Sequence, residues 1–123
     1  MTDSFTVKHR PLEIRLKRED KILEVDFDDG RRFRLPAELL RVESPSAEIM
    51  GHGGEKTILA GRRHVAIVGV EPVGNYAVRL LFDDLHDTGL YTWDYLYELG
   101  QGQDRIWQTY LDALASRGLS REP

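Results

Sequence analysis

Hydrophobic and polar residues alternate one by one through the first part of the chain, in three runs at residues 11–17, 22–28 and 31–35. In the first run, for example, Ile14 lies between the charged residues Glu13 and Arg15. A period of two with one charged face is typical of half-buried antiparallel strands. The pattern therefore predicts three strands, in which the acids of the second run face the arginines of the third.

The dipeptide Asp29-Gly30 separates the second and third runs. Aspartate followed by glycine between two strands is typical of a tight hairpin of type I′, which needs positive φ at both central residues. We therefore predict a hairpin of this type at Asp29-Gly30.

The middle of the chain is less regular. A short helical turn is predicted over 36–40, with Pro36 at its first position. Residues 41–63 are predicted as mostly loop, with a short strand over 57–59. Two further strands, over 64–71 and 76–82, flank a turn.

The period changes to that of a helix in the last third of the chain. Trp93, Leu96 and Tyr97 share one helical face, and a second such face follows from Trp107 to Leu114. The pattern predicts helices over 93–99 and 103–117, separated by glycines.

Strands followed by helices predict the α+β class, as a two-layer sandwich of a mostly antiparallel sheet with the C-terminal helices packed on one face. One domain is expected over 11–118, with a flexible arm over 1–10 and a flexible tail over 119–123. The predicted core consists of Leu23, Val25, Phe27, Val78, Leu80, Phe82, Trp93, Leu96, Trp107 and Leu111.

Composition excludes several classes of function. The 123 residues carry 17 basic and 21 acidic side chains, a net charge of −4, which argues against binding to nucleic acid or to an anionic membrane. The absence of cysteine excludes disulfides, thiol catalysis and cysteine-ligated metal sites. No apolar run approaches the roughly 20 residues that span a bilayer, and no secretory signal is visible, so a cytoplasmic location is expected.

The densest polar chemistry follows the last predicted strand, where Asp83, Asp84, His86 and Asp87 are close in sequence. A metal site of His86 with Asp84 and Asp87 would suit zinc, iron or manganese, and a second histidine, His52 or His64, would have to come from elsewhere. His86 with either aspartate could also act as an acid/base pair. The alternative, which we favour, is that the acids form a turn and cap a helix.

Two other groups suggest a surface for a partner. The basic run Arg62, Arg63 and His64 would suit an acidic partner, although charged strand faces usually serve solubility. Tyr91 and Trp93 could join this surface, together with His52 from a glycine-rich loop, although aromatics at helical spacing are more often core. The candidate interaction surface is therefore His52, Arg62, Arg63, His64, Tyr91 and Trp93.

Four motifs occur in a fixed order: residues 11–14, 23–30, 39–46 and the run from Asp84 to Trp93. Together they resemble the γ-butyrobetaine hydroxylase-like N-terminal domain, also called DUF971. The resemblance extends from Pro11 to about Leu114 and is closest to the standalone bacterial members.

The resemblance implies a zinc site that this chain has lost. Family members hold zinc with three cysteines and a histidine, and the corresponding positions here are Ser44, Ser46, Ile49 and His86. Serine binds zinc poorly and isoleucine cannot bind it, so no cofactor is expected. We expect the Ser44–Ser46 segment to lie close to His86, joined by hydrogen bonds in place of the metal.

Three functions follow from these observations. The first is a non-catalytic accessory or protein-interaction module, which the resemblance links to iron–sulfur or iron-dependent oxygenase systems and to an unidentified protein partner. The second is a metal-binding protein that uses His86 with Asp84 and Asp87. The third is a small enzyme with a His86–aspartate acid/base pair.

Overall fold

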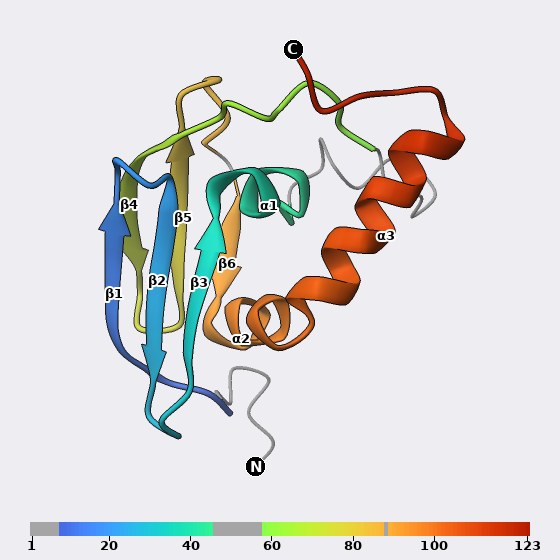
Figure 1. Cartoon of the computed structure of the whole chain (residues 1–123). Helices are drawn as coiled ribbons and strands as arrows, with labels where there is room; N and C mark the ends of the chain where they lie inside the picture. The colour runs from blue at the N-terminus through green and yellow to red at the C-terminus, as the bar shows by residue number, and fades with distance from the viewer. Residues whose placement is uncertain (1–7, 46–57, 88) are drawn as a thin grey trace.

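The structure is a computed structural model that describes residues 8–45, 58–87 and 89–123. This part of the chain contains six strands and three helices, which confirms the predicted α+β class. In Figure 1 the strands form the left side of the molecule and the helices lie to their right, with α3 outermost. Ser46, Ile49, His52 and Thr57 lie outside the described residues. Ile58 and Leu59 are described but form no strand, so the predicted strand over 57–59 is wrong at these two positions.

The first sheet has the order β1-β2-β3, all antiparallel, and matches the three alternating runs. Its strands are β1 (Pro11–Lys17), β2 (Ile22–Phe27) and β3 (Arg32–Pro36). On its outer face the Arg15 guanidinium bridges Glu24 and Asp26 at 3.0 Å each, and Arg34 lies 3.1 Å from Glu24. The predicted pairing of acids with arginines across this sheet is therefore confirmed.

The hairpin between β2 and β3 is confirmed, but its predicted turn type is wrong. Among the residues of this loop φ is positive only at Gly30, at +88°, whereas type I′ also needs it at Asp29. Phe27 N–H donates to the Arg31 carbonyl at 2.8 Å, and Gly30 N–H donates to the Phe27 carbonyl at 3.1 Å. These bonds enclose a three-residue loop in which glycine takes the left-handed position, a common alternative hairpin.

The second sheet has the order β4-β5-β6, also antiparallel. Strands β4 (Ile67–Val73) and β5 (Ala77–Phe82) lie where they were predicted, but β6 (Leu90–Thr92) was not predicted. Three residues are too few to show a period, and they lead directly into a helix. The strands thus form two three-stranded sheets, rather than the one sheet that the sequence suggested.

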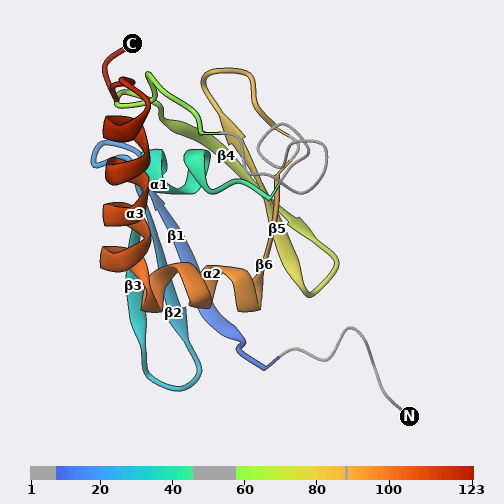
Figure 2. The same ribbon diagram turned by 90° about the vertical axis from the view of Figure 1, so that its right-hand side faces the viewer.

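The helices are α1 (Ala37–Val42), α2 (Trp93–Gln101) and α3 (Gln103–Ser116). Thr92 caps α2, because its hydroxyl accepts a hydrogen bond from Tyr95 N–H at 3.1 Å. The predicted break between the last two helices falls at Gly102. Figure 2 shows α1 and α2 lying across the two sheets.

The main core lies between the two sheets, α1 and α2, and every residue of α1 is buried. All of the predicted core residues are buried except Trp107 and Leu111, which are only partly buried. Their helix, α3, packs with Tyr110 and Leu114 against Val42 and residues 58–60, in a separate small cluster. The packing of α3 on α1 rather than on a sheet explains why half of its apolar face stays accessible.

Candidate functional site

Ser44 and His86, which are far apart in sequence, meet in the interior. Ser44 follows α1 and His86 follows the turn after β5, and their side chains lie with Ser44 Oγ 2.9 Å from His86 Nε2. Their exposed fractions are only 1% and 5%. The predicted proximity of the serine segment to His86 is therefore confirmed at Ser44, whereas Ser46 and Ile49 lie outside the described residues.

The Ser44 hydroxyl belongs to a longer hydrogen-bonded chain. It also bonds to the Tyr91 phenol, which in turn donates to the Leu40 carbonyl. A carbonyl can only accept, so the Tyr91 O–H points to Leu40, the Ser44 O–H points to Tyr91, and His86 Nε2 must supply a proton to Ser44. This chain of bonds favours the tautomer with a hydrogen on His86 Nε2.

Gly89 fits closely over this network. A Cβ atom at position 89 would lie 2.4 Å from Ser44 Oγ and 3.1 Å from the Tyr91 ring. The first distance is far below any normal contact, so a larger residue would displace the serine hydroxyl. Glycine has no reactive side chain, and the sequence indicates Gly89 only as part of a turn.

The turn before His86 repeats the geometry of the β2–β3 hairpin. Phe82 N–H donates to the His86 carbonyl at 3.0 Å, and Leu85 N–H donates to the Phe82 carbonyl at 3.1 Å. Leu85 thus takes the position that Gly30 takes in the first hairpin. Its φ is +72° and its side chain is 90% exposed, so a leucine occupies a left-handed position without burying its side chain.

Asp84 faces two arginines. Its carboxylate oxygen Oδ2 lies 2.7 Å from Arg41 Nε and 3.0 Å from Arg62 Nε, and Arg41 itself is buried. Burial alone would raise the pKa of Asp84, but the hydrogen bonds from Arg41 and from the His86 backbone, with both positive charges, hold that pKa below its ordinary value. Asp84 is therefore an ionised partner of arginines.

Of the side chains proposed to act with His86, Asp84 contacts its backbone, and Asp87 and His64 are exposed. Asp84 Oδ1 accepts from the His86 backbone N–H at 3.2 Å, and it is Ser44 that faces Nε2 of the ring. Asp87 is exposed, as is His64. Within residues 8–45, 58–87 and 89–123, no group of three or more metal-binding side chains comes together.

The candidate interaction surface is only partly on the outside. Tyr91 is fully buried and Trp93 is 9% exposed, with its indole N–H donating to the Asn75 carbonyl at 2.7 Å. These two residues offer no surface to a partner, because they fill the core between β6 and α2. Arg63 and His64 are exposed, and His52 lies outside the described residues.

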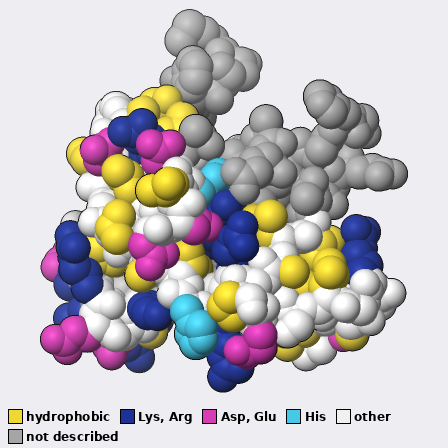
Figure 3. Space-filling model, turned by 90° about the horizontal axis from the view of Figure 1, so that it is seen from above, with side chains coloured by type: hydrophobic (Ala, Val, Ile, Leu, Met, Phe, Trp, Pro, Cys, Tyr) yellow, Lys and Arg dark blue, Asp and Glu magenta, His cyan; other side chains and the backbone are white. Residues whose placement is uncertain are grey.

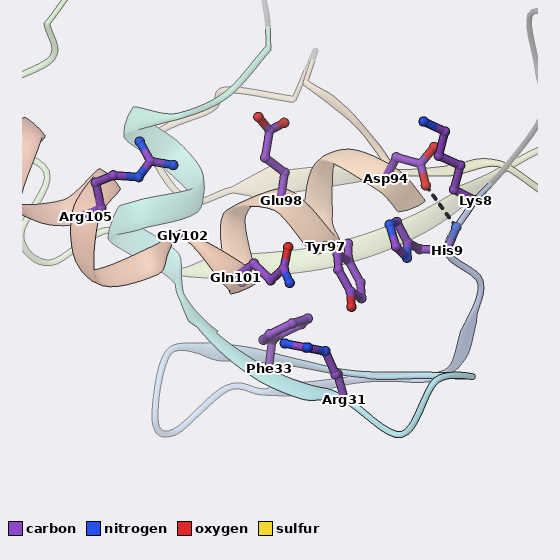
Figure 4. Close-up of a pocket in the computed structure, with 11 residues that line it drawn as sticks. Lys8, His9, Arg31, Phe33, Asp94, Tyr97, Glu98, Gln101, Gly102 and Arg105 are labelled. Atoms are coloured by element: carbon purple, nitrogen blue, oxygen red, sulfur yellow. Dashed lines mark hydrogen bonds between the residues drawn. The ribbon is translucent and has the colours of Figure 1, made fainter.

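A pocket that the sequence did not predict lies between the N-terminal arm, the β2–β3 hairpin and α2. It is an open pocket of about 640 Å³, and Figure 4 shows the side chains that line it. The His9 ring stacks on Tyr97 with centroids 3.6 Å apart, and His9 N–H donates to Asp94 at 3.0 Å. Lys8 and His9 were assigned to a flexible arm, so their contribution was missed.

In the part of the chain that the structure describes, no helix is long and apolar enough to cross a membrane. Figure 3 shows basic and acidic side chains interspersed on one face of the molecule. Mixed charges of this kind are typical of a surface that does not attract a polyanion.

Two antiparallel sheets with a buried serine–histidine pair at the end of α1 define an α+β domain. Residues 14–97 match the family model described as γ-butyrobetaine hydroxylase-like, N-terminal. The match covers more than half of the chain, and the chain belongs to this family, also known as DUF971.

Solved structures agree with this assignment. Two proteins whose structures were determined in solution by NMR share 50% and 45% identity with the chain, each with a TM-score of 0.83. The alignments cover 94% and 100% of this chain, and 91% and 92% of those proteins. A crystal structure of a DUF971 protein of unknown function from Acidithiobacillus ferrooxidans is 44% identical, over 80% of this chain and 98% of that one, with a TM-score of 0.64. Among curated proteins, none matches the chain.

Proposed function

We propose that this chain is a non-catalytic accessory module that binds a protein partner, in the iron–sulfur or iron-dependent oxygenase systems with which its family is linked. The observation that carries the proposal is the buried hydrogen bond between Ser44 and His86. A nucleophile or general base needs access to a substrate, whereas both of these side chains are enclosed by the core.

The neighbouring charges support the same conclusion. Asp84 forms ion pairs with Arg41 and Arg62, and the Tyr91 hydroxyl donates to a backbone carbonyl. Ser44, His86, Asp84 and Tyr91 thus each have a partner within the fold. Because these buried residues stabilise the fold, we expect the function to depend on residues at the surface.

Leu85 marks the surface that we assign to the partner. It costs about 1 kcal/mol to hold a residue other than glycine in the left-handed region, and an exposed leucine recovers none of this by burial. The backbone of this turn is bonded to residue Ala66, because Asp83 N–H donates to the Ala66 carbonyl at 2.9 Å. Leu85 follows this backbone bond on one strand end, and the exposed residues Arg63 and His64 precede it on the other segment, so we define these three as the partner surface.

The test is quantitative recovery of partners from native lysate with the tagged chain. Leu85→Gly removes the exposed side chain at a position that suits glycine, so the fold is retained. Leu12→Ala is the matched control, since Leu12 is also exposed, at 73%, but lies on β1. We expect an iron–sulfur or oxygenase component with the wild type and the control, and several-fold less with Leu85→Gly. Equal recovery with all three proteins, or no such component, would contradict the proposal.

The metal-binding alternative makes a different prediction. If His86 binds zinc or iron with Asp84 and Asp87, protein purified without an affinity tag should carry close to one equivalent of metal by elemental analysis. The accessory module should carry less than a tenth of an equivalent, and its melting temperature should not move when zinc or iron is added.

A further inference from the structure

The sequence predicts a flexible tail for the C-terminal residues 119–123. In the structure, however, the side chain of Arg121 binds between α1 and α3. Arg121 Nε lies 2.9 Å from one oxygen of Glu38, and its second nitrogen lies 2.7 Å from the other. Glu38, on α1, is only 8% exposed in its side chain. Two parallel bonds to a buried carboxylate are the geometry that a guanidinium makes and an ammonium cannot.

An aromatic ring completes the cradle for this guanidinium. The Arg121 guanidinium carbon lies over the Trp107 ring, 5.2 Å from its centroid. Cations are attracted to the face of an indole, and arginine stacks on it better than lysine does. Glu38 from α1 and Trp107 from α3 thus contact the same guanidinium from two directions.

The backbone next to Arg121 is bound as well. Gly61 N–H donates to the Ser120 carbonyl at 2.9 Å, and Arg63 N–H donates to the Arg121 carbonyl at 3.1 Å. The side chain of Arg63 forms an ion pair with Glu122. The groove therefore binds an arginine followed by an acidic residue, in a segment that lies alongside residues 61–63.

The groove is built from residues outside the segment that fills it. Its parts come from α1, α3 and residues 61–63, and the tail is joined to α3 through Gly118, which has a φ of +65°. A cavity of about 280 Å³ remains beside Arg121, lined also by Leu39 and Asp104. A segment of the same chemistry from another protein would find the same donors, carboxylate and ring.

We propose that Glu38, Trp107 and the backbone of residues 61–63 form an arginine-recognition site, which the chain fills with its own Arg121 and which a partner protein fills with an extended arginine–acid segment. Charge complementarity selects this occupant: Glu38 requires the guanidinium, and Arg63 requires the acid that follows it. The inference deepens the proposed function and rests on it for the existence of a partner.

The test uses the full chain with Arg121→Ala, which empties the cradle, and the peptide acetyl-Ser-Arg-Glu-Pro-amide, which repeats residues 120–123. The indole N–H resonance of Trp107 reports binding. We expect a saturable shift with the emptied variant, and a shift in the wild type only at higher peptide concentration, because Arg121 competes. A peptide with lysine in place of arginine should bind roughly tenfold more weakly or worse, since a hydrogen bond to a charged group is lost.

The double variant Glu38→Gln/Arg121→Ala supplies the matched control, because it keeps the shape of the cradle and removes its charge. We expect it to lose peptide binding while retaining the fold. If Arg121→Ala alone does not fold, Arg121→Lys is titrated in the same way, as its ammonium holds the site less tightly. No saturable shift with a folded variant, or equal binding of the lysine peptide, would overturn the proposal. That failure would leave the recovery of a partner through Leu85 unaffected, so the two proposals can fail separately.

Discussion

Ser44 occupies a space that admits a hydroxyl and little more. Gly89→Ala would place a Cβ atom 2.4 Å from Ser44 Oγ, so the serine must move and its bonds to His86 and Tyr91 must lengthen. We expect the free energy of unfolding to fall by about 1–3 kcal/mol, the usual cost of overpacking, as measured by urea denaturation. Gly69→Ala is the control, because its Cβ would meet Leu81 at an ordinary 3.5 Å. Equal stability of both variants would show that Ser44 is not held closely.

Leu85 and Gly30 occupy equivalent positions in two turns of the same geometry. The substitutions Leu85→Gly and Gly30→Ala should therefore have opposite effects on the free energy of unfolding. Leu85→Gly should keep the melting temperature or raise it, with a gain of up to about 1 kcal/mol. Gly30→Ala should cost about 1 kcal/mol, although no atom lies within 4 Å of the added Cβ, because φ is +88° there. A large loss of stability in Leu85→Gly would mean that the leucine side chain supports the fold.

At the scale of elements, the outer face of the first sheet makes stability depend on pH. The hydrogen bonds from Arg15 hold the pKa values of Glu24 and Asp26 below their ordinary 4.5 and 3.8. Carboxyl groups with a lowered pKa in the folded state stabilise it above those ordinary values, and this contribution is lost as the pH falls through the folded values. We expect the denaturation midpoint to fall steeply below about pH 4.

Arg15→Gln provides the comparison for this pH dependence. Without the guanidinium, the two carboxyl groups should titrate closer to their ordinary values, so the variant should be less stable at neutral pH and less sensitive to acid. If its acid transition is as steep as that of the wild type, other carboxyl groups carry the dependence.

Helix α3 provides a second prediction at this scale. Phe82 is buried between the sheets, so Phe82→Ala should cost about 3–5 kcal/mol by urea denaturation. Trp107 is partly buried against α1 and the tail, and Trp107→Ala should therefore cost clearly less. Equal losses would mean that α3 is as much a part of the main core as β5 is.

The elements that the sequence predicted are those whose residues repeat with a period. The alternation around Ile14 and Val25, and the helical spacing from Trp93 onwards, are local properties that place strands and helices within a few residues. β6 is too short to show a period, and the turn type at Gly30 depends on loop length rather than on the dipeptide. The site was predicted at Ser44 and His86 because of the family resemblance, since nothing local brings these residues together.

At the scale of the whole molecule, the features that sequence reasoning missed are contacts between distant segments. Lys8 and His9 line a pocket with α2, and Arg121 joins α1 to α3, although both ends of the chain were predicted to be flexible. Such contacts depend on where the fold places a segment relative to the rest of the molecule. The residue pattern within the segment itself does not predict them. The two arginines around Asp84 were missed for the same reason, because Arg41 and Arg62 come from separate parts of the chain.

The central claim is that the polar cluster at His86 is structural, and the protonation of its ring tests this most directly. In a long-range ¹H–¹⁵N spectrum, the account predicts a protonated Nε2 for His86, hydrogen-bonded to Ser44, that is unchanged when one equivalent of zinc is added. A His86 resonance that shifts when zinc is added would contradict the structural role and indicate a metal site in its place, and an unprotonated Nε2 would contradict the direction of the hydrogen bond to Ser44.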